Sequence, residues 1–197
     1  MKMRQVLIVA IVVPALGAIV VARTYRQAAL PHYVRLEHGV PQFGYSRYTS
    51  PPANVEADIA GDHMRIDYYA PSAHGRKIMG GLVPYGVVWC TGANWATKIT
   101  TENDLKIGDL NLPKGSYSIW TLPGEKEWML IINKETGQFH LNYDASQDFG
   151  RTKMNLKPLD QPVETFRIEL RSNGGNQGTL ALLWEKTEAS IPFTVKK

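Results

Sequence analysis

A long apolar run near the N-terminus places the strongest constraint on this chain. Residues 6–22 are seventeen positions with no charged or polar side chain, flanked by Lys2, Arg4, Arg23 and Arg26. At 1.5 Å per helical residue, the run spans roughly 25 Å, near the lower limit for crossing a bilayer core. A signal peptide has a shorter apolar core, of about 7–15 residues, and then a small-residue cleavage site. The run predicts an uncleaved transmembrane helix within residues 1–26, with a cleaved signal peptide as the alternative.

The cations around this run say little about orientation. Two of them and the amino terminus precede it, and two follow it, which is a near tie on the positive-inside rule. Because the N-terminal side is too short to fold, we expect it to stay in the cytoplasm and the body to be translocated. In a bacterium this predicts a single-pass inner-membrane protein with its C-terminal domain in the periplasm. The lipid bilayer is then a partner through residues 6–22.

The charge and cysteine content make several classes of function poor candidates. The formal net charge is +4, which equals the four cations flanking the run, so the eighteen remaining Lys and Arg balance eighteen Asp and Glu. Nucleic-acid binding needs clustered cations, so we expect no nucleic-acid partner. Cys90 is the single cysteine, which excludes an internal disulfide, and there is no C-x-x-C-H haem motif. We expect no cofactor.

Residues 27–54 have the composition of an extended linker. They contain four prolines and show no sustained hydrophobic period. They also contain too many aromatic residues for a purely flexible tether. Tyrosine is favoured where one end of a side chain is apolar and the other is wet, as at interfaces and membrane surfaces. We therefore expect Tyr33, Phe43, Tyr45 and Tyr48 to lie along a partner or a membrane interface.

Residues 55–197 read as a single all-β domain. Short apolar or alternating segments recur at roughly ten-residue spacing, which indicates an antiparallel β-sandwich of the jelly-roll or Ig-like kind. Pro-Gly at 123–124 predicts a hairpin turn, and the Asn-Gly-Gly-Asn run at 173–176 another turn. No segment after residue 26 has a helical period. The predicted strands are 63–68, 96–101, 116–122, 127–132, 138–143, 153–156, 163–171, 179–185 and 191–195.

Residues 67–97 are the segment that generic β patterning does not explain. Five glycines and two prolines punctuate a long loop there, and loops of such length are usually functional or packed on themselves. The loop reads DYxxPSxxGRxIxGGLVPYGxVWxTGANxAT, which resembles the signature of the DUF2911 family, bacterial proteins of unknown function that are usually exported. Further similarity at 112–118, 123–128 and 143–148 extends the resemblance over roughly residues 55–170. The resemblance implies an exported β-rich domain and no particular activity.

The chain departs from the family pattern at two loop positions. The pattern has Arg where Cys90 stands and an acidic residue where Trp95 stands. Apolar replacements suit a surface that docks onto a partner, since exposed aromatic residues mark such surfaces. The alternatives are a buried, inert Cys90 and a Trp95 inside the sandwich. The predicted partner-contact residues are Trp89, Cys90, Trp95, Tyr33, Phe43, Tyr45 and Tyr48.

The polar loop residues do not make a convincing catalytic site. Asp67, Ser72, His74 and Arg76 are close in sequence, but a Ser-His-acid site needs converging side chains and an oxyanion hole. No G-x-S-x-G elbow is present either. We therefore assign no catalytic residue and expect a protein that is not an enzyme. Asp67, Arg76, Thr91 and Asn94 are kept as polar candidates for ligand contact.

Metal ligands are likewise not indicated. The five histidines show neither H-x-H nor H-x-x-x-H spacing, although His63, His74 and His140 could meet across strands. The acidic stretch 144–148 lacks the glycine and the terminal Glu of a calcium loop, so it predicts a turn between strands. We expect no metal.

Two classes of function fit these observations. An anchor, an aromatic linker and a charge-neutral β domain predict a non-catalytic accessory or structural subunit of a larger integral membrane protein complex, with respiratory and photosynthetic assemblies as candidates. The alternative is a periplasmic small-ligand or carbohydrate-binding module, or an envelope enzyme, with its site on the 67–97 loop. In that case Trp89 and Trp95 are the sugar-contact candidates, while Trp120, Trp128 and Trp184 are predicted to be core.

Overall fold

The structure, a computed structural model, describes residues 33–37, 40–43 and 50–196. The chain divides into two compact units, Met1–Thr49 and Ser50–Lys197. In the first unit, β1 (Tyr33–Glu37) and β2 (Val40–Phe43) pair as an antiparallel hairpin, in a segment that the sequence predicts as linker. The predicted transmembrane run lies outside the described residues. Within the described ranges, no helix has the length and apolar character needed to cross a membrane.

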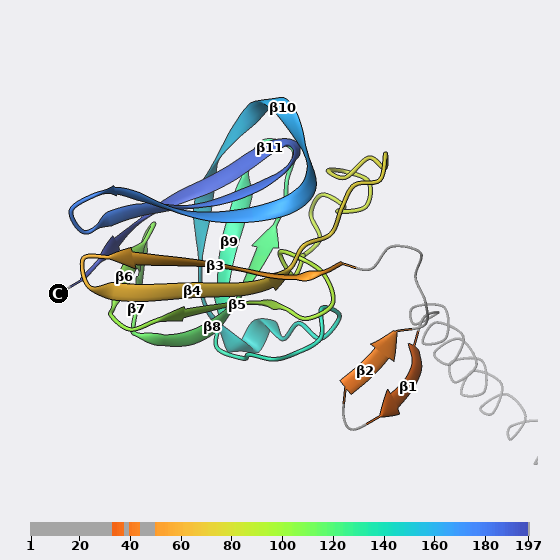
Figure 1. Ribbon diagram of the computed structural model, residues 1–197, viewed down its shortest axis with the longest axis horizontal. Coiled ribbons are helices and arrows are strands. Elements are labelled where there is room, and N and C mark those ends of the chain that lie inside the picture. The colour runs from red at the N-terminus through yellow and green to blue at the C-terminus, as the bar shows by residue number, and fades with distance from the viewer. Residues whose placement is uncertain (1–32, 38–39, 44–49, 197) are drawn as a thin grey trace, which may run out of the picture. The chain divides into compact units, whose positions relative to one another are not determined.

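The second unit contains a nine-stranded antiparallel sheet (Figure 1). Its hydrogen-bonded order is β3-β4-β5-β8-β9-β10-β11-β6-β7, and every neighbouring pair is antiparallel. The all-β antiparallel prediction is therefore confirmed, and the sandwich type stays a prediction. The strands are β3 (Pro52–Ile59), β4 (Asp62–Tyr69), β5 (Thr97–Thr101), β6 (Leu105–Ile107), β7 (Leu110–Leu112), β8 (Gly115–Leu122), β9 (Trp128–Asn133), β10 (Asp148–Gly174) and β11 (Gln177–Val195).

Two long strands connect the parts of this sheet. β10 pairs with β9 through residues 148–154 and with β11 through residues 155–174. β11 then continues to pair with β6 through residues 193–195. In Figure 1 these two strands form a bent, twisted ribbon above β3 and β4. Because each long strand takes part in two ladders, the sheet is continuous from β3 to β7.

Each long strand replaces two shorter strands that the sequence predicts. Segments 153–156 and 163–171 lie within β10, and segments 179–185 and 191–195 lie within β11. The pairing register shifts between Pro158 and Val163, where proline interrupts the ladder because it has no N–H to donate. That interruption explains why the sequence pattern predicts two strands, whereas the backbone of β10 stays extended throughout.

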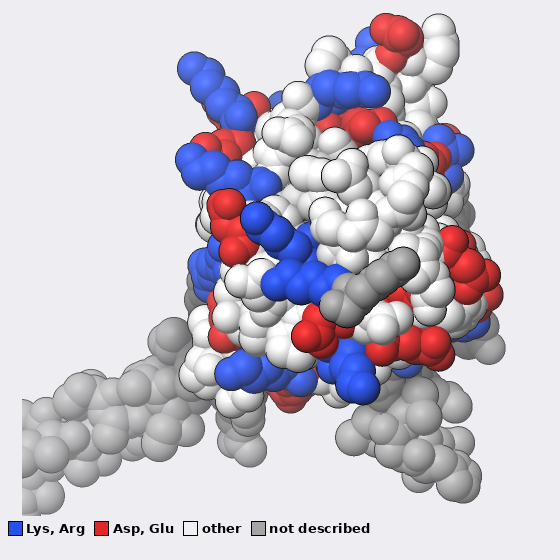
Figure 2. Space-filling model, turned by 90° about the vertical axis from the view of Figure 1, so that its left-hand side faces the viewer, with Lys and Arg blue, Asp and Glu red and all other residues white. Residues whose placement is uncertain are grey.

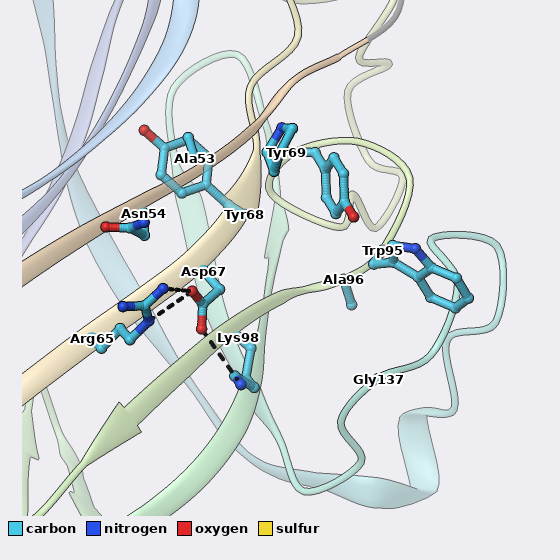
Figure 3. A pocket seen from close by; sticks show the side chains of 11 residues that line it. Ala53, Asn54, Arg65, Asp67, Tyr68, Tyr69, Trp95, Ala96, Lys98 and Gly137 are labelled. Carbon is cyan, nitrogen blue, oxygen red and sulfur yellow. Dashed lines mark hydrogen bonds and ion pairs between the residues drawn. The ribbon is translucent and has the colours of Figure 1, made fainter. Parts of the chain in front are cut away.

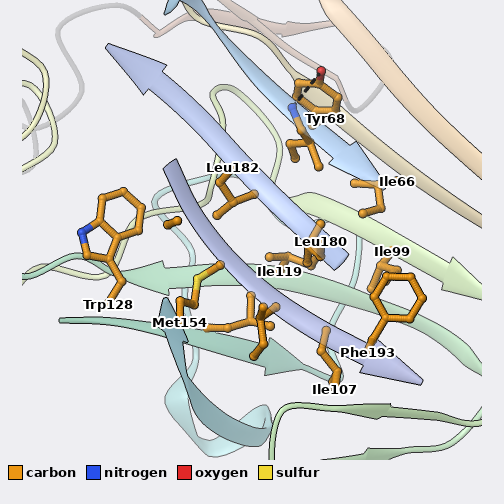
Figure 4. Close-up of a cluster of buried hydrophobic side chains, with 14 of the residues drawn as sticks. Ile66, Tyr68, Ile99, Ile107, Ile119, Trp128, Met154, Leu180, Leu182 and Phe193 are labelled. Atoms are coloured by element: carbon orange, nitrogen blue, oxygen red, sulfur yellow. Dashed lines mark hydrogen bonds between the residues drawn. The ribbon is translucent and has the colours of Figure 1, made fainter. Parts of the chain in front are cut away.

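One cluster of buried apolar side chains forms the main core (Figure 4). Alternation along β4 turns Met64, Ile66 and Tyr68 inward, on the same face as the buried Asp62, and leaves residues 63, 65, 67 and 69 on the outer face. Trp128 and Trp184 are buried, as predicted. The remaining strands contribute further members, including Ile99, Ile107, Ile119, Met154, Leu180, Leu182 and Phe193.

A smaller apolar cluster lies on the opposite side of β8 and β9. It contains Cys90, Ala96, Trp120 and Ile131, so the third tryptophan predicted to be core is also buried. Trp120 is next to Ile119 on β8, and Ile131 is next to Ile132 on β9. Because neighbouring residues on a strand point to opposite faces, Trp120 and Ile131 lie on the face away from the main core. The loop between β4 and β5 supplies the other two members. This cluster fixes the loop onto the sheet.

Two of the predicted turns are present, whereas one predicted strand is absent and two short strands were not predicted. The turns at 123–126 and 173–176 are present as predicted, with β8 pairing to β9 and β10 to β11. The predicted strand 138–143 is wrong, because that segment makes only an isolated bridge, between Phe139 and Trp95. Strands β6 and β7 have three residues each, too few to show a period. Asp144 caps a 3₁₀ helix, η1 (Ala145–Gln147), within the predicted turn.

Candidate functional site

The loop between β4 and β5, residues 70–96, is held to the body at several points. Isolated bridges join Ser72 to Thr165 on β10, Trp89 to Thr121 on β8, and Trp95 to Phe139. Further along the loop, the backbone N–H of residue 86 donates to the carbonyl of residue 123 at 2.8 Å. In Figure 1 the yellow part of this loop projects beyond the strands. The loop is therefore ordered by contacts with the body, and one part of it protrudes.

The loop displays three large, exposed apolar side chains. Leu82 is 48% exposed, Tyr85 38% and Val87 53%. We call these three residues the loop patch. Beneath them Ile78, Met79 and Val83 are buried in the main core. The segment that carries the loop patch is thus anchored to the core through its buried neighbours.

A tight turn over residues 77–83 gives the loop patch its shape. The N–H of Leu82 donates to the Lys77 carbonyl at 3.1 Å, and those of Gly81 and Val83 donate to the Ile78 carbonyl at 3.0 and 2.9 Å. A Cβ on Gly81 would overlap the Lys77 carbonyl oxygen, so this position requires glycine. The backbone of this turn therefore holds Leu82, the first residue of the loop patch, in a defined position.

The side chains of Trp89 and Cys90 pack into the body of the domain. The Trp89 indole stacks on Trp184 with ring centroids 5.7 Å apart, and its edge contacts Phe166 at 5.1 Å. Its N–H donates to the Gly92 carbonyl at 2.9 Å. Cys90 is 4% exposed, as the alternative interpretation predicts, and burial raises the pKa of its thiol to about 12. Cys90 therefore offers little surface to a partner, while part of the Trp89 side chain stays exposed.

Trp95 is half-buried and lines an open groove on the outer face of the sheet (Figure 3). The groove has a volume of about 490 Å³ and lies over the ends of β3, β4 and β5. In Figure 3 the rings of Tyr69 and Trp95 lie on one side, and Arg65, Asp67 and Lys98 on the other. Such a mixture of aromatic faces and a few polar groups is the usual lining of a ligand site.

The charged side of the groove is an ion-pair network. Asp67 accepts from Arg65 Nε at 2.8 Å, and its second oxygen lies 3.4 Å from Lys98 Nζ. Arg65 also contacts Glu56 on β3. The hydrogen bond from Arg65 holds the pKa of Asp67 below its usual range, with the positive charges of Arg65 and Lys98 acting in the same direction. Asp67 is therefore a carboxylate, and an acceptor only, at neutral pH.

The other polar candidates serve the loop itself. Arg76 donates from Nε to the Ala73 carbonyl at 2.9 Å and from Nη2 to the Ser72 carbonyl at 2.6 Å. Thr91 is fully buried at a φ of 56°, and its carbonyl accepts from the Thr97 hydroxyl at 2.7 Å. A threonine at positive φ is strained, and this bond helps to hold it.

Asn94 and His140 join the loop to the segment before η1. The Asn94 carbonyl accepts from the His140 N–H at 2.9 Å, and His140 Nδ1 lies at the same distance from it. Burial lowers the pKa of His140, which favours the neutral ring. Asn94 also has a φ of 60°, a conformation that asparagine tolerates better than most residues. This contact sets the position of Trp95 next to Asn94.

The residues considered for catalysis bond to different groups. Ser72 Oγ lies 2.7 Å from Thr165 Oγ1, the His74 backbone N–H donates to Glu164 at 2.7 Å, and Asp67 belongs to the groove network. Exposed His63 bonds to Asp58 at 2.9 Å. Across the described ranges, no three His, Cys, Asp or Glu side chains are gathered where they could hold a metal ion.

Charged side chains of both signs cover the end of the body shown in Figure 2. Lys and Arg lie beside Asp and Glu there, around an uncharged area. This mixture agrees with the balanced charge of residues 27–197. On that face the surface gives no sign of the clustered cations that nucleic acid requires.

A family model described as "Protein of unknown function (DUF2911)" matches residues 50–193. The chain belongs to the DUF2911 family. The match runs from just before β3 almost to the end of β11, so the DUF2911 domain is the nine-stranded unit with its loop patch and groove. The chain matches no curated protein and no solved structure.

The sequence pointed to part of this candidate site and not to the rest. It named Asp67 and Trp95, which the fold brings to one groove, but not Arg65, Tyr69 or Lys98. Alternation along the predicted strands carries that signal, because residues 65, 67 and 69 share one strand face. The loop patch was missed too, since a loop has no period that separates exposed from buried apolar residues. Tyr33, Phe43, Tyr45 and Tyr48 have side chains outside the described residues.

Proposed function

We propose that the DUF2911 domain is a non-catalytic accessory subunit that docks onto an integral membrane protein complex through its loop patch. The observation that supports this most strongly is the exposure of Leu82, Tyr85 and Val87 close together in the sequence of one loop. Single exposed apolar residues are ordinary, but a group of them marks an interaction surface. The loop patch replaces Trp89 and Cys90 as the proposed contact.

The buried residues of the same loop support a role in docking, because they keep the exposed segment ordered. Ile78 and Val83 are buried and the turn between them is hydrogen-bonded, so Leu82 is held in place before a partner arrives. Ordering a loop on binding costs free energy, and a preformed surface avoids much of that cost. An apolar side chain that is buried at the centre of an interface then contributes strongly.

The predicted anchor supports a partner within the same membrane. A helix at residues 6–22 would hold the domain beside the bilayer, on the periplasmic side in the proposed orientation. Tethering raises the effective concentration of the domain near other membrane proteins. Respiratory or photosynthetic assemblies are the class of partner complex that we propose.

For the fold we propose a sandwich of the jelly-roll or Ig-like type, which the bent β10–β11 ribbon supports.

The test is a comparison of native complexes. Membranes that contain C-terminally tagged full-length protein are solubilised gently and separated by native electrophoresis. We expect the wild type to migrate with a larger complex, and the double variant Leu82→Ala, Val87→Ala to migrate alone. Leu141→Ala is the matched control, because Leu141 is 53% exposed but lies on another segment. Wild-type protein that migrates alone, or a double variant that stays in the complex, would contradict the proposal.

A further inference from the structure

The groove beside the loop has chemistry that the proposed docking function does not use. It is separate from the loop patch, since none of Leu82, Tyr85 and Val87 lines it. We infer that the groove lined by Tyr69, Trp95, Asp67 and Lys98 is a binding site for a neutral oligosaccharide.

The aromatic side of the groove suits the apolar face of a sugar ring. A pyranose presents C–H groups on its faces and hydroxyls around its edge, so it packs flat against an aromatic ring. Tyr69 and Trp95 supply two such rings near each other (Figure 3). Half-buried aromatic rings with an apolar body and a polar edge suit such wet sites.

Trp95 is held in place rather than loosely exposed. Its ring meets the edge of Phe139 at 5.7 Å, with the planes 83° apart, and Phe139 itself is 4% exposed. A backbone bridge joins the same two residues. The indole is therefore supported on one side by a buried ring. Such support keeps a binding side chain in position at little entropic cost on binding.

The polar side of the groove can receive hydroxyl groups. The Asp67 oxygen near Lys98 accepts one contact at 3.4 Å, and Lys98 Nζ has three N–H donors of which that contact uses one. An acceptor thus lies beside a donor. Neighbouring hydroxyls of a sugar both donate and accept, so a vicinal pair matches this arrangement, and bonds to charged groups are the stronger ones.

The charge balance favours a neutral ligand over an anionic one. Arg65 is already engaged with Asp67 and with Glu56. Lys98 is the second cation of the groove, and it lies next to the Asp67 carboxylate. An anion bound at Lys98 would be repelled by Asp67 at close range. Hydroxyl groups incur no such repulsion.

The size of the groove fits a short oligosaccharide. Ligand sites typically have volumes of about 300–1,000 Å³, and the volume of about 490 Å³ falls within that range. At one side Gly137 lines the groove without a side chain, and the space beside it is open. A chain of sugars could therefore extend past the part that contacts the rings.

The test is titration calorimetry on the full-length protein in lauryldimethylamine oxide, a detergent without a sugar headgroup. The probes are cellotetraose, maltotetraose and tetra-N-acetylchitotetraose. We expect at least one to bind with a Kd tighter than about 10 mM, and Trp95→Ala and Lys98→Met each to weaken it about tenfold or more. Lys98→Met keeps the stem of the side chain on a strand, so it removes the donor without disturbing the fold.

Two matched variants complete the design. Lys153→Met removes another strand lysine, which is ion-paired to Glu127 at 2.8 Å, and should leave binding unchanged. The loop-patch double variant should also bind sugar normally, which separates a failure of this inference from a failure of the proposed docking. The inference is overturned if none of the three probes binds the wild type, or if either groove variant binds as tightly as the wild type.

Discussion

Arg171 on β10 and Glu188 on β11 form a two-point ion pair, in which Nη1 and Nη2 of the guanidinium each lie 3.1 Å from one carboxylate oxygen. They are not cross-strand neighbours, because Arg171 is paired in register with Thr179. The nine residues from 179 to 188 would span roughly 30 Å in a straight strand. The contact therefore requires the β10–β11 ribbon to bend back on itself, as Figure 1 shows. Glu185, between those positions, has a φ of 53° and lies at a register shift.

We expect Arg171→Met to destabilise the body. Glu188 is only 5% exposed, so loss of its partner leaves a buried carboxylate with Lys157 at 3.7 Å as the nearest cation. Breaking a fully buried pair costs about 3–5 kcal/mol, and the 37% exposure of the Arg171 side chain reduces this to about 2 kcal/mol. Urea denaturation measures the change. Arg167→Met, which removes a more exposed ion pair on the same strand, is the control and should cost less than about 1 kcal/mol.

The same pair should make stability depend on pH in the acid range. The hydrogen bond from Arg171 holds the pKa of Glu188 below its usual value. A carboxyl with a lowered folded pKa contributes stability above its unfolded pKa, near about 4.3, and this is lost as pH falls through the folded pKa. We therefore expect wild type and Glu188→Gln to differ in unfolding free energy at about pH 7, and this difference to shrink as the pH is lowered below about 4.3 and through the folded pKa. A difference that persists undiminished at the lower pH would contradict this assignment.

The alternation of single strands was predictable, and the bend between them was not. Met64, Ile66 and Tyr68 point inward as their pattern indicates. The Pro158–Val163 register shift reads in sequence as the end of a strand, whereas the backbone continues and the ribbon turns. Sequence patterns report which residues are apolar at short range. The long-range contact of Arg171 with Glu188 depends on the path of the whole ribbon, which no local pattern encodes.

In the candidate site, too, the local features were predictable and the long-range ones were not. Asp67 and Trp95 stand out in sequence as unusual residues, and both line the groove. Their partner Lys98 lies opposite Asp67 because β4 pairs with β5 in one particular register. A shift by one residue would turn Lys98 to the other face. Register, rather than residue type, was therefore the missing information.

Trp89 and Trp95 should respond differently to truncation. Trp89 packs against Trp184 and Phe166, so Trp89→Ala should lower the free energy of unfolding by about 3 kcal/mol. Trp95 lies at the groove, and Trp95→Ala should lower it by about 1 kcal/mol. Thermal and urea denaturation of the two full-length variants would be compared directly. Equal losses would mean that Trp95 belongs to the core as Trp89 does.

The Cys90 thiol should be unreactive in the native protein. It is 4% exposed, and burial raises its pKa to about 12, so almost no thiolate is present at neutral pH. We expect no reaction with Ellman's reagent in native buffer and complete reaction in guanidinium chloride. A Leu141→Cys, Cys90→Ala variant controls for reagent access, because residue 141 is exposed and should react at once. Rapid native labelling of wild-type protein would show that the second cluster opens.

Gly81→Ala should disturb the loop patch while leaving the strands paired. The added Cβ would overlap the Lys77 carbonyl oxygen, which belongs to the backbone and cannot turn aside as a side chain can. The turn must open, which weakens the hydrogen bonds that Leu82 and Val83 donate. Overpacking of this kind costs about 1–3 kcal/mol, so we expect faster amide exchange across residues 78–83 and loss of the native complex.

Gly75→Ala is the control, since its Cβ meets nothing within 4 Å and only its φ of 72° adds strain. Unchanged exchange in Gly81→Ala would show that the turn has room for a side chain, and that the arrangement of the loop patch does not depend on glycine.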